Sequence, residues 1–251
     1  MRSPVESAGV RGSGMSAGAI NPEMRRRFDT AEKVRVGDTD LRRPALRPSE
    51  TTLRAHFKSS IRDAAVELEN PHVEPKITAA ERARATAASV LIAIVLRDSE
   101  PTVLVTQRHQ RISYPGHWVF PGGRADADDS TPIETALREA EEEIGLDPSR
   151  VEILGRLGDY YSHSGFRIAT TVALVRPPFE LTPHPGEVEA IAEIELARLL
   201  DSSSYFLFRF QDRRDRAHFA LDTESEEILL TGVTASLCIG LYSELLKTHT
   251  D

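Results

Sequence analysis

The sequence predicts a mixed α/β fold of the α+β type, in which strands and helices do not alternate regularly. Two β-branched runs at 87–96 and 102–106 flank a turn at 98–101, and this pattern predicts a hairpin. The segment 132–144 has the apolar spacing of an amphipathic helix. Several later strand-like runs follow one another without helices between them, which disfavours a doubly wound parallel sheet.

The chain has 251 residues, enough for one large domain with appendages or at most two small domains. Its single cysteine, Cys238, excludes an internal disulfide and a cysteine-based zinc site, and it favours a reducing compartment. The longest apolar run, 87–96, is shorter than the roughly 20 residues of a membrane-spanning helix. The N-terminus lacks the apolar run of a secretory signal. We therefore expect a cytoplasmic protein that does not bind membranes.

Charge is unevenly distributed along the chain, whose formal net charge is −8. Residues 1–48 hold ten Lys and Arg against six Asp and Glu, so the remaining chain carries −12. An acidic body lacks the basic face that nucleic-acid binding requires. Small phosphates can still bind an acidic protein where a metal ion inverts the local charge.

The first 48 residues are rich in Gly, Ser, Arg and Pro without a sustained apolar period, so we predict a disordered extension. A domain is expected from 49 to 251. It begins with a helix at 49–68, and a polar connection follows at 70–84. The apolar stripe of that helix is Leu53, Phe57, Ile61 and Ala65.

Further strands and helices are predicted in the rest of the chain. Strands are predicted at 118–120, 151–157, 167–175, 188–194, 206–210 and 218–221, and helices at 196–200 and 228–247. The last helix is expected to bury Leu229, Val233, Leu237, Leu241 and Leu245, with an inert Cys238 beside them.

The helix at 132–144 has clear start and stop signals. Thr131 is a suitable N-cap, Pro132 suits the first helical position, and Glu134 completes a capping box. Gly145 is a suitable C-terminal stop.

Three carboxylates of this helix, Glu139, Glu142 and Glu143, share one arc opposite the apolar face, whereas Glu141 lies off that arc. Each like-charge pair costs about 0.2–0.5 kcal/mol on an isolated helix. A solvated acidic face is the simplest explanation. The preceding glycine pair, however, lets backbone approach the same place, and carboxylate oxygens suit Mg²⁺ or Mn²⁺. Together these features favour a metal site.

The pair Gly122-Gly123 and the run Arg-Glu-Ala-Glu-Glu-Glu-Ile-Gly-Leu at 138–146 resemble the box of the Nudix hydrolases. The pattern Arg-Glu-apolar-x-Glu-Glu-x-Gly-apolar is matched at every position. Arg124 and Ser130 stand where the general box has a Gly and a Glu. Either Asp126 or Asp129 is then the replacement for the loop carboxylate.

The glycine pair is shifted by one residue relative to the general box. This spacing resembles the coenzyme A pyrophosphatase subgroup, and the resemblance covers roughly residues 87–245. The subgroup pattern Phe-Pro-Gly-Gly-x-x-Asp-x-x-Asp is present at 120–129, and Thr-Ala-Leu-Arg-Glu-Ala at 135–140. Gly232, Thr234 and Ala235 match its C-terminal helix. The chain departs from the subgroup at His109 and at 112–115.

The resemblance implies a Nudix-type mixed sheet sandwiched between helices, with an added N-terminal helix. It also implies hydrolysis of a nucleoside diphosphate derivative with Mg²⁺ or Mn²⁺ held by Glu139, Glu142 and Glu143. Glu139 is also a candidate to orient or deprotonate water, and the Gly123 carbonyl is a candidate further ligand. Arg138 is expected to anchor a glutamate of the box.

Residues outside the helix complete the candidate site. Glu187 is a candidate distal glutamate for catalysis, or else a surface residue, with Glu189 as its alternative. Arg108 either holds a substrate phosphate or forms a strand-edge ion pair. Gly122 and Gly123 are the backbone candidates for substrate binding. Three histidines are candidates for a catalytic base or else ordinary loop residues: His109, His117 and His163. Three aromatic residues either stack on the adenine of a substrate or pack in the core: Tyr160, Tyr161 and Phe166.

The first functional hypothesis is hydrolysis of coenzyme A or its derivatives to 3′,5′-ADP and a phosphopantetheine product. The second is a Nudix hydrolase acting on ADP-ribose, a dinucleoside polyphosphate or a nucleoside triphosphate. The third is a module that senses nucleotides without cleaving them, which the three intact box glutamates disfavour. The expected partner is a small nucleotide, with a homodimer left open as the assembly.

Overall fold

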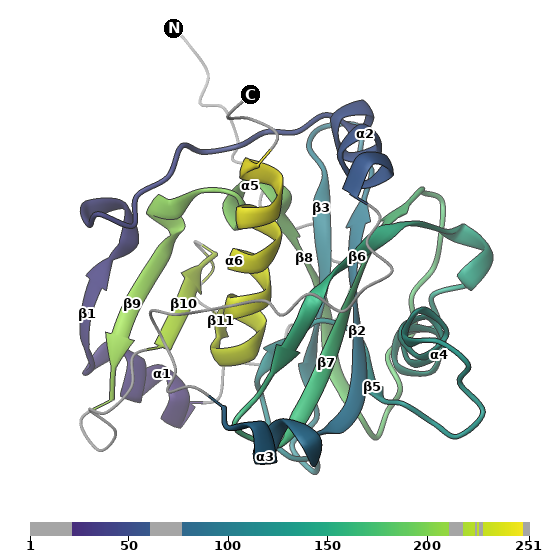
Figure 1. Ribbon diagram of the computed structural model, residues 1–251, viewed down its shortest axis with the longest axis horizontal. Coiled ribbons are helices and arrows are strands. Elements are labelled where there is room, and N and C mark those ends of the chain that lie inside the picture. The colour runs from purple at the N-terminus through teal and green to yellow at the C-terminus, as the bar shows by residue number, and fades with distance from the viewer. Residues whose placement is uncertain (1–21, 61–76, 211–217, 224, 226–227, 248–251) are drawn as a thin grey trace, which may run out of the picture.

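The computed structural model describes residues 22–60, 77–210, 218–223, 225 and 228–247. It contains a seven-stranded mixed sheet with helices on both faces and a four-stranded antiparallel sheet beside it (Figure 1). The mixed α+β class predicted from the sequence is confirmed. The four-stranded sheet is an addition that the sequence patterns did not define as a separate layer.

The seven-stranded sheet has the path β4-β3-β2-β7-β6, with β5 paired to β2 and β8 paired to β3. Its strands are β2 (Thr86–Val95), β3 (Thr102–Arg108), β4 (Trp118–Val119), β5 (Gly122–Arg124), β6 (Val151–Tyr161), β7 (Phe166–Val175) and β8 (Val188–Glu195). Among the hydrogen-bonded strand pairs of the described residues, the pair β2–β7 alone is parallel, and the predicted hairpin of β2 and β3 is present.

Helices cover the two faces of this sheet with different apolar clusters because successive side chains of a strand point to opposite faces. The helix α4 (Pro132–Ile144) packs on the face that carries Leu91, Ala93 and Val95 of β2. The helices α2 (Glu50–Ser60) and α6 (Gly232–Leu246) pack on the face of Ile92 and Ile94. Within the described ranges, no helix is long and apolar enough to cross a membrane.

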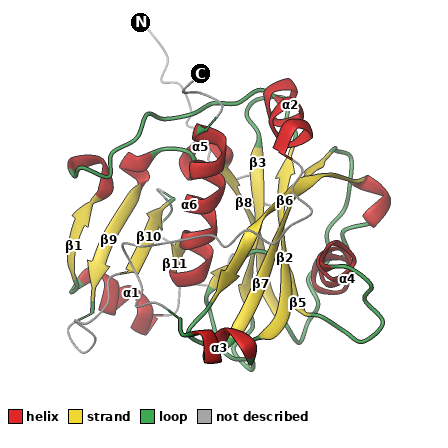
Figure 2. Ribbon diagram, in the orientation of Figure 1, coloured by secondary structure: helices red, strands yellow, loops and turns green. Residues whose placement is uncertain are grey.

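The second sheet has the order β1-β9-β10-β11 and is antiparallel throughout (Figure 2). Its strands are β1 (Glu32–Arg35), β9 (Tyr205–Arg209), β10 (His218–Asp222) and β11 (Leu229–Thr231). The helix α1 (Pro22–Asp29) packs on it through Phe28, whose ring meets those of Phe206 and Phe208 edge to face.

The structure corrects the prediction of disorder for the part of the extension that it describes, residues 22–48. This segment forms α1, β1 and the 3₁₀ turn η1 (Val36–Asp38), and it buries Phe28, Val36 and Leu46. These apolar residues are too widely spaced to create a local period. They become core residues only because β9 and its neighbours lie beside them. Residues 1–21 lie outside the described residues.

Three other elements differ from the sequence prediction. The helix predicted at 49–68 is α2, and its expected stripe residues Ile61 and Ala65 lie outside the described residues. The polar connection at 70–84 includes a helix, α3 (Ala79–Ala83), which Thr78 and Glu81 cap. The last helix begins at Gly232, so Leu229 lies in β11.

Short elements complete the chain: the helix α5 (Leu196–Leu199) and the 3₁₀ turns η2 (Pro148–Arg150) and η3 (Ser202–Ser204). The predicted helix at 196–200 is therefore present, one residue shorter.

We predict that Phe28→Ala destabilises the protein by about 3 kcal/mol, because a buried aromatic side chain is replaced by a cavity. Urea unfolding of the full chain measures this change. Val34→Ala in β1 is the matched control, because Val34 is 43% exposed and its truncation removes little buried area. Equal, small effects of both substitutions would show that the extension does not pack on the second sheet.

Candidate active site

Local signals hold α4 in register above the sheet. The Thr131 hydroxyl accepts a hydrogen bond from the Glu134 N–H at 3.2 Å, and Gly145 ends the helix with a left-handed φ of 68°. The Glu134 carboxylate accepts from the Ser130 N–H at 2.7 Å, one residue earlier than in the predicted capping box. The helix therefore begins and ends where the sequence predicts.

The glycine pair of β5 lies directly against the carboxylates of α4. The Gly122 N–H donates to Glu143 Oε2 at 3.1 Å. Gly122 has a φ of 154°, and a Cβ there would collide with the carbonyl oxygen of Ser89. A Cβ at Gly123 would collide with the carboxylate of Glu139. Gly122 needs to be glycine because its φ and the adjacent strand β2 leave no room for a Cβ, whereas a side chain at Gly123 would displace the Glu139 carboxylate.

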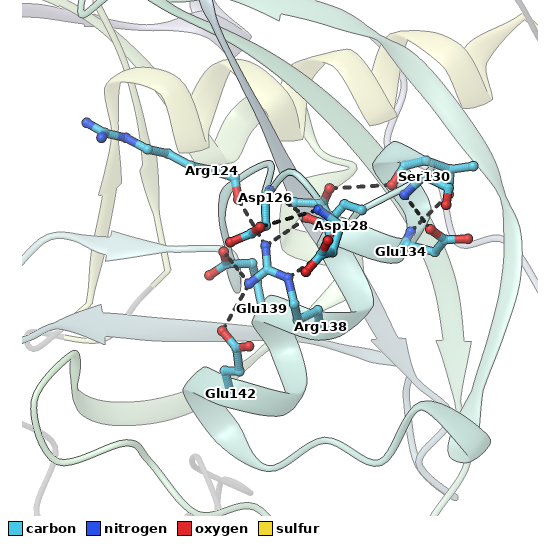
Figure 3. Close-up of polar contacts among 11 residues, drawn as sticks. Arg124, Asp126, Asp128, Ser130, Glu134, Arg138, Glu139 and Glu142 are labelled. Atoms are coloured by element: carbon cyan, nitrogen blue, oxygen red, sulfur yellow. Dashed lines mark hydrogen bonds and ion pairs between the residues drawn. The ribbon is translucent and has the colours of Figure 1, made fainter.

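Arg138 makes five hydrogen bonds, three to the end of β5 and the loop after it and two within α4 (Figure 3). Its Nε and Nη2 donate to both oxygens of Asp129 at 3.0 and 2.9 Å, and Nη2 also donates to the Arg124 carbonyl. Its Nη1 donates to Glu139 at 2.9 Å and Glu142 at 3.0 Å.

These contacts show which of the two candidate loop carboxylates Arg138 engages. Asp129 is the partner of Arg138, whereas Asp126 supports Asp129 by donating its backbone N–H at 2.8 Å. Hydrogen bonds from Arg138 hold the pKa of the Asp129 carboxyl well below its usual range. The same pair raises the pKa of the Arg138 guanidinium. The arginine therefore stays charged and fixed in place.

The three box glutamates have different environments. Glu143 is buried, with 5% of its surface exposed, whereas 57% of the Glu142 side chain is exposed beside Arg138. Burial raises the pKa of Glu143 to about 7, and the Gly122 hydrogen bond opposes this shift. Burial also raises the pKa of Glu139. The three carboxylates that the sequence places on one arc of the helix thus differ in their exposure. Glu141, which lies off that arc, is exposed.

Two candidates from other elements lie close enough to influence these carboxylates. The charge of Glu187 raises the pKa of both Glu139 and Glu143, and the charge of Arg108 lowers that of Glu143. The Arg108 Nε donates to the Ser113 carbonyl at 2.7 Å, so the guanidinium is positioned by the loop after β3. Among the described residues, Arg108 has no ion-pair partner. The strand-edge ion pair considered for it is therefore absent there.

The segment before β8 was missed by sequence reasoning, although it positions Glu187. The N–H groups of Thr182 and His184 donate to the carbonyls of Ile144 and Glu143, each at 2.8 Å. The helix end leaves such carbonyls without partners, so the segment caps α4. No residue pattern of the segment indicates this role, because backbone groups make the bonds.

The remaining candidates have structural partners. Glu189 lies 3.6 Å from His109, and burial lowers the pKa of His117, whose Nδ1 is 3.1 Å from the Tyr114 carbonyl. Tyr160 packs in the core, and His163 is exposed in the turn between β6 and β7. Tyr161 and Phe166 each lie beneath an arginine: Arg82 and Arg124, respectively.

The donor chemistry of the site suits a hard divalent cation. Among the described residues, no three His, Cys, Asp or Glu side chains converge as a ready metal site. Glu139 and Glu143 nevertheless lie one turn apart against the same strand. Their pKa values are raised, and a bound cation would lower them by favouring the ionised carboxylates. Glu142 is held by Arg138 and would have to turn to join them.

The residues of this candidate site lie in the part of the chain that resembles known proteins. Residues 86–228 match the family model of the NUDIX domain. A Photorhabdus laumondii protein named Uncharacterized Nudix hydrolase NudL is 36% identical over 60% of this chain and 80% of its own length. A Yersinia enterocolitica protein of the same name is 44% identical over 47% of this chain and 61% of its own length. A Caenorhabditis elegans Ap4A hydrolase structure gives a TM-score of 0.42 at 16% identity, covering 65% of this chain and 96% of that one.

We predict that Glu143→Gln stabilises the metal-free protein increasingly as pH rises from about 4.5 to 8. The folded pKa is about 7 and lies above the ordinary value of 4.5. The stability that Glu143 contributes is therefore complete below 4.5 and is lost as pH rises through 7. Because one pKa unit corresponds to about 1.4 kcal/mol, the difference reaches a few kcal/mol. Melting temperatures measured with chelator across this range test it.

Glu141→Gln serves as the control because Glu141 is exposed. Its melting curve should run parallel to that of the wild type at every pH. Parallel curves for Glu143→Gln as well would contradict the burial of an ionisable Glu143.

Proposed function

The chain belongs to the NUDIX family, and we propose that it hydrolyses the diphosphate of coenzyme A or its derivatives. The products would be 3′,5′-ADP and a phosphopantetheine compound. Nudix hydrolases act on pyrophosphate bonds and generally need divalent metal ions. The main support for a metal-dependent hydrolase is the contact of Glu139 and Glu143 with the glycine pair of β5.

Glu139, Glu142 and Glu143 are the proposed metal-binding carboxylates, and the Gly123 carbonyl is a further candidate. When bound, Mg²⁺ or Mn²⁺ would polarise the phosphate and lower the pKa of the attacking water. The raised pKa values of Glu139 and Glu143 mark them as groups whose ionised form gains from a nearby cation.

The other site residues have supporting roles in this proposal. Glu139 or Glu187 orients water and accepts its proton. Arg138 fixes Glu139 relative to the loop at Asp129. Arg108, which lacks an ion-pair partner among the described residues, supplies positive charge to the substrate diphosphate. An arginine is suited to this because its planar fork matches phosphate oxygens.

Two features support coenzyme A over other diphosphates. The shifted loop carboxylate of the coenzyme A pyrophosphatase pattern, Asp129, holds Arg138 through both of its oxygens. Thr234 of the C-terminal pattern donates its hydroxyl to the Trp118 carbonyl at 3.2 Å. This bond ties α6 to β4, which directly precedes the glycine pair. Both subgroup features therefore bear on the site.

We predict that incubation of the protein with coenzyme A and Mg²⁺ releases 3′,5′-ADP. Chromatographic product analysis would compare coenzyme A with ADP-ribose, a diadenosine polyphosphate and a nucleoside triphosphate. Turnover of any of these that equals or exceeds coenzyme A turnover would replace the proposed substrate but keep the hydrolase. Nucleotide binding without any cleavage would instead favour a sensing module.

We predict that Glu142→Gln and Glu143→Gln each lower kcat by about a hundredfold or more, equivalent to roughly 3 kcal/mol of transition-state stabilisation. The substitution keeps side-chain size but removes the charge that a cation requires. Glu141→Gln is the control, because Glu141 lies off the strand-facing side and should change kcat little. Near-normal rates for Glu142→Gln and Glu143→Gln would falsify the metal-ligand assignment.

A further inference from the structure

The guanidinium of Arg124, stacked on Phe166, points to a second phosphate-binding site beside the diphosphate site. We propose that it binds a phosphomonoester on the ribose of the nucleotide substrate, such as the 3′-phosphate of coenzyme A. The inference rests on the proposed function, because the carboxylates of α4 must hold the adjoining diphosphate.

The position of Arg124 in the fold places its backbone at the edge of the site, and its side chain extends from there onto Phe166. Arg124 is the last residue of β5 and directly follows Gly123, whose backbone lies against Glu139. Adjacent Cα atoms are about 3.8 Å apart, so the side chain begins one residue from that contact. Its carbonyl accepts from Arg138 at 3.0 Å, which fixes the backbone. Figure 3 shows the Arg124 side chain extending away from Arg138 and its carboxylate partners.

The guanidinium is held in place without being neutralised. Its Cζ lies 5.4 Å from the centroid of the Phe166 ring, and Phe166 packs against the main core cluster. The side chain of Arg124 is exposed, and among the described residues it has no carboxylate partner. Stacking on a ring leaves the N–H donors at the guanidinium edge available. Arg138, in contrast, is engaged by three carboxylates.

The chemistry of such a group favours a phosphate ligand. The chain carries a net charge of −8, and the carboxylates of α4 would repel a second substrate anion unless a cation lies nearby. An arginine can bind two phosphate oxygens at once, which gives geometric specificity as well as attraction. Arg108 on β3 and Arg124 on β5 thus provide two separate cations for two separate phosphate groups.

The test measures binding without turnover. Calorimetry of the full chain with Mg²⁺ would compare 3′,5′-ADP with 5′-AMP, which differ only in the 3′-phosphate. We expect the wild type to bind 3′,5′-ADP at least about tenfold more tightly, the factor for about 1.4 kcal/mol. Arg124→Gln should reduce this ratio to near one. Arg124→Lys should retain part of it, because the charge remains without the planar fork.

Arg35→Gln is the matched control. Arg35 also stacks on a phenylalanine, Phe206, with its Cζ 4.3 Å from the ring centroid, but it lies on β1 at the opposite side of the molecule (Figure 1). This variant should keep the full wild-type ratio. A ratio near one in the wild type, or an unchanged ratio in Arg124→Gln, would overturn the proposal. So would an equal loss for both nucleotides in Arg124→Gln, because that would show contact with the base or the 5′-phosphate.

Turnover assays separate this proposal from the proposed function. If coenzyme A is not cleaved but the binding ratio is lost only in the Arg124 variants, the phosphomonoester site stands and the proposed reaction fails. If coenzyme A and dephospho-coenzyme A are cleaved with equal kcat/KM by the wild type and by Arg124→Gln, the reaction stands and the phosphomonoester site fails.

Discussion

The site depends on one close contact, in which the glycine backbone of β5 lies against the carboxylates of α4. Glu143 is buried there and has the Gly122 N–H as its hydrogen-bond donor. A buried carboxylate without such a donor is strongly disfavoured. The contact therefore requires a strand without side chains at two positions and a helix whose residues four apart face it. Arg138 and the segment that caps α4 hold the helix in place at this contact.

Negative charge gathers at this contact, and the arginines near it fall into two classes. Arg138 is saturated by carboxylates and by the Arg124 carbonyl, so it serves to fix the loop at Asp129 to the helix. Arg108 and Arg124 have no carboxylate partner among the described residues and are available to a ligand. This division combines a rigid frame with two cations that have no carboxylate partner in the described part of the chain, as the proposed binding of a phosphate substrate to an acidic protein requires.

Residues outside the family match complete the fold. Residues 86–228 supply the seven-stranded sheet and α4. The helices that cover the other face, α2 and α6, come from before and after that region, and both contribute to the main core cluster. Thr234 of α6 bonds directly to β4. The flanking segments are thus part of the same core rather than separate appendages.

Features that depend on neighbouring residues could be predicted from the sequence alone, including the limits of α4 through Thr131 and Gly145, the main strands and the glutamate-rich box. These follow from local capping, periodicity and motif spacing. The three-dimensional arrangement of the chain was needed to establish that Glu143 is the buried box glutamate and that Asp129 is the carboxylate that engages Arg138. It also decided that residues 22–48 fold, since Phe28 is buried by strands about 180 residues away in sequence. Burial and partner choice depend on residues distant in sequence, which no local pattern records.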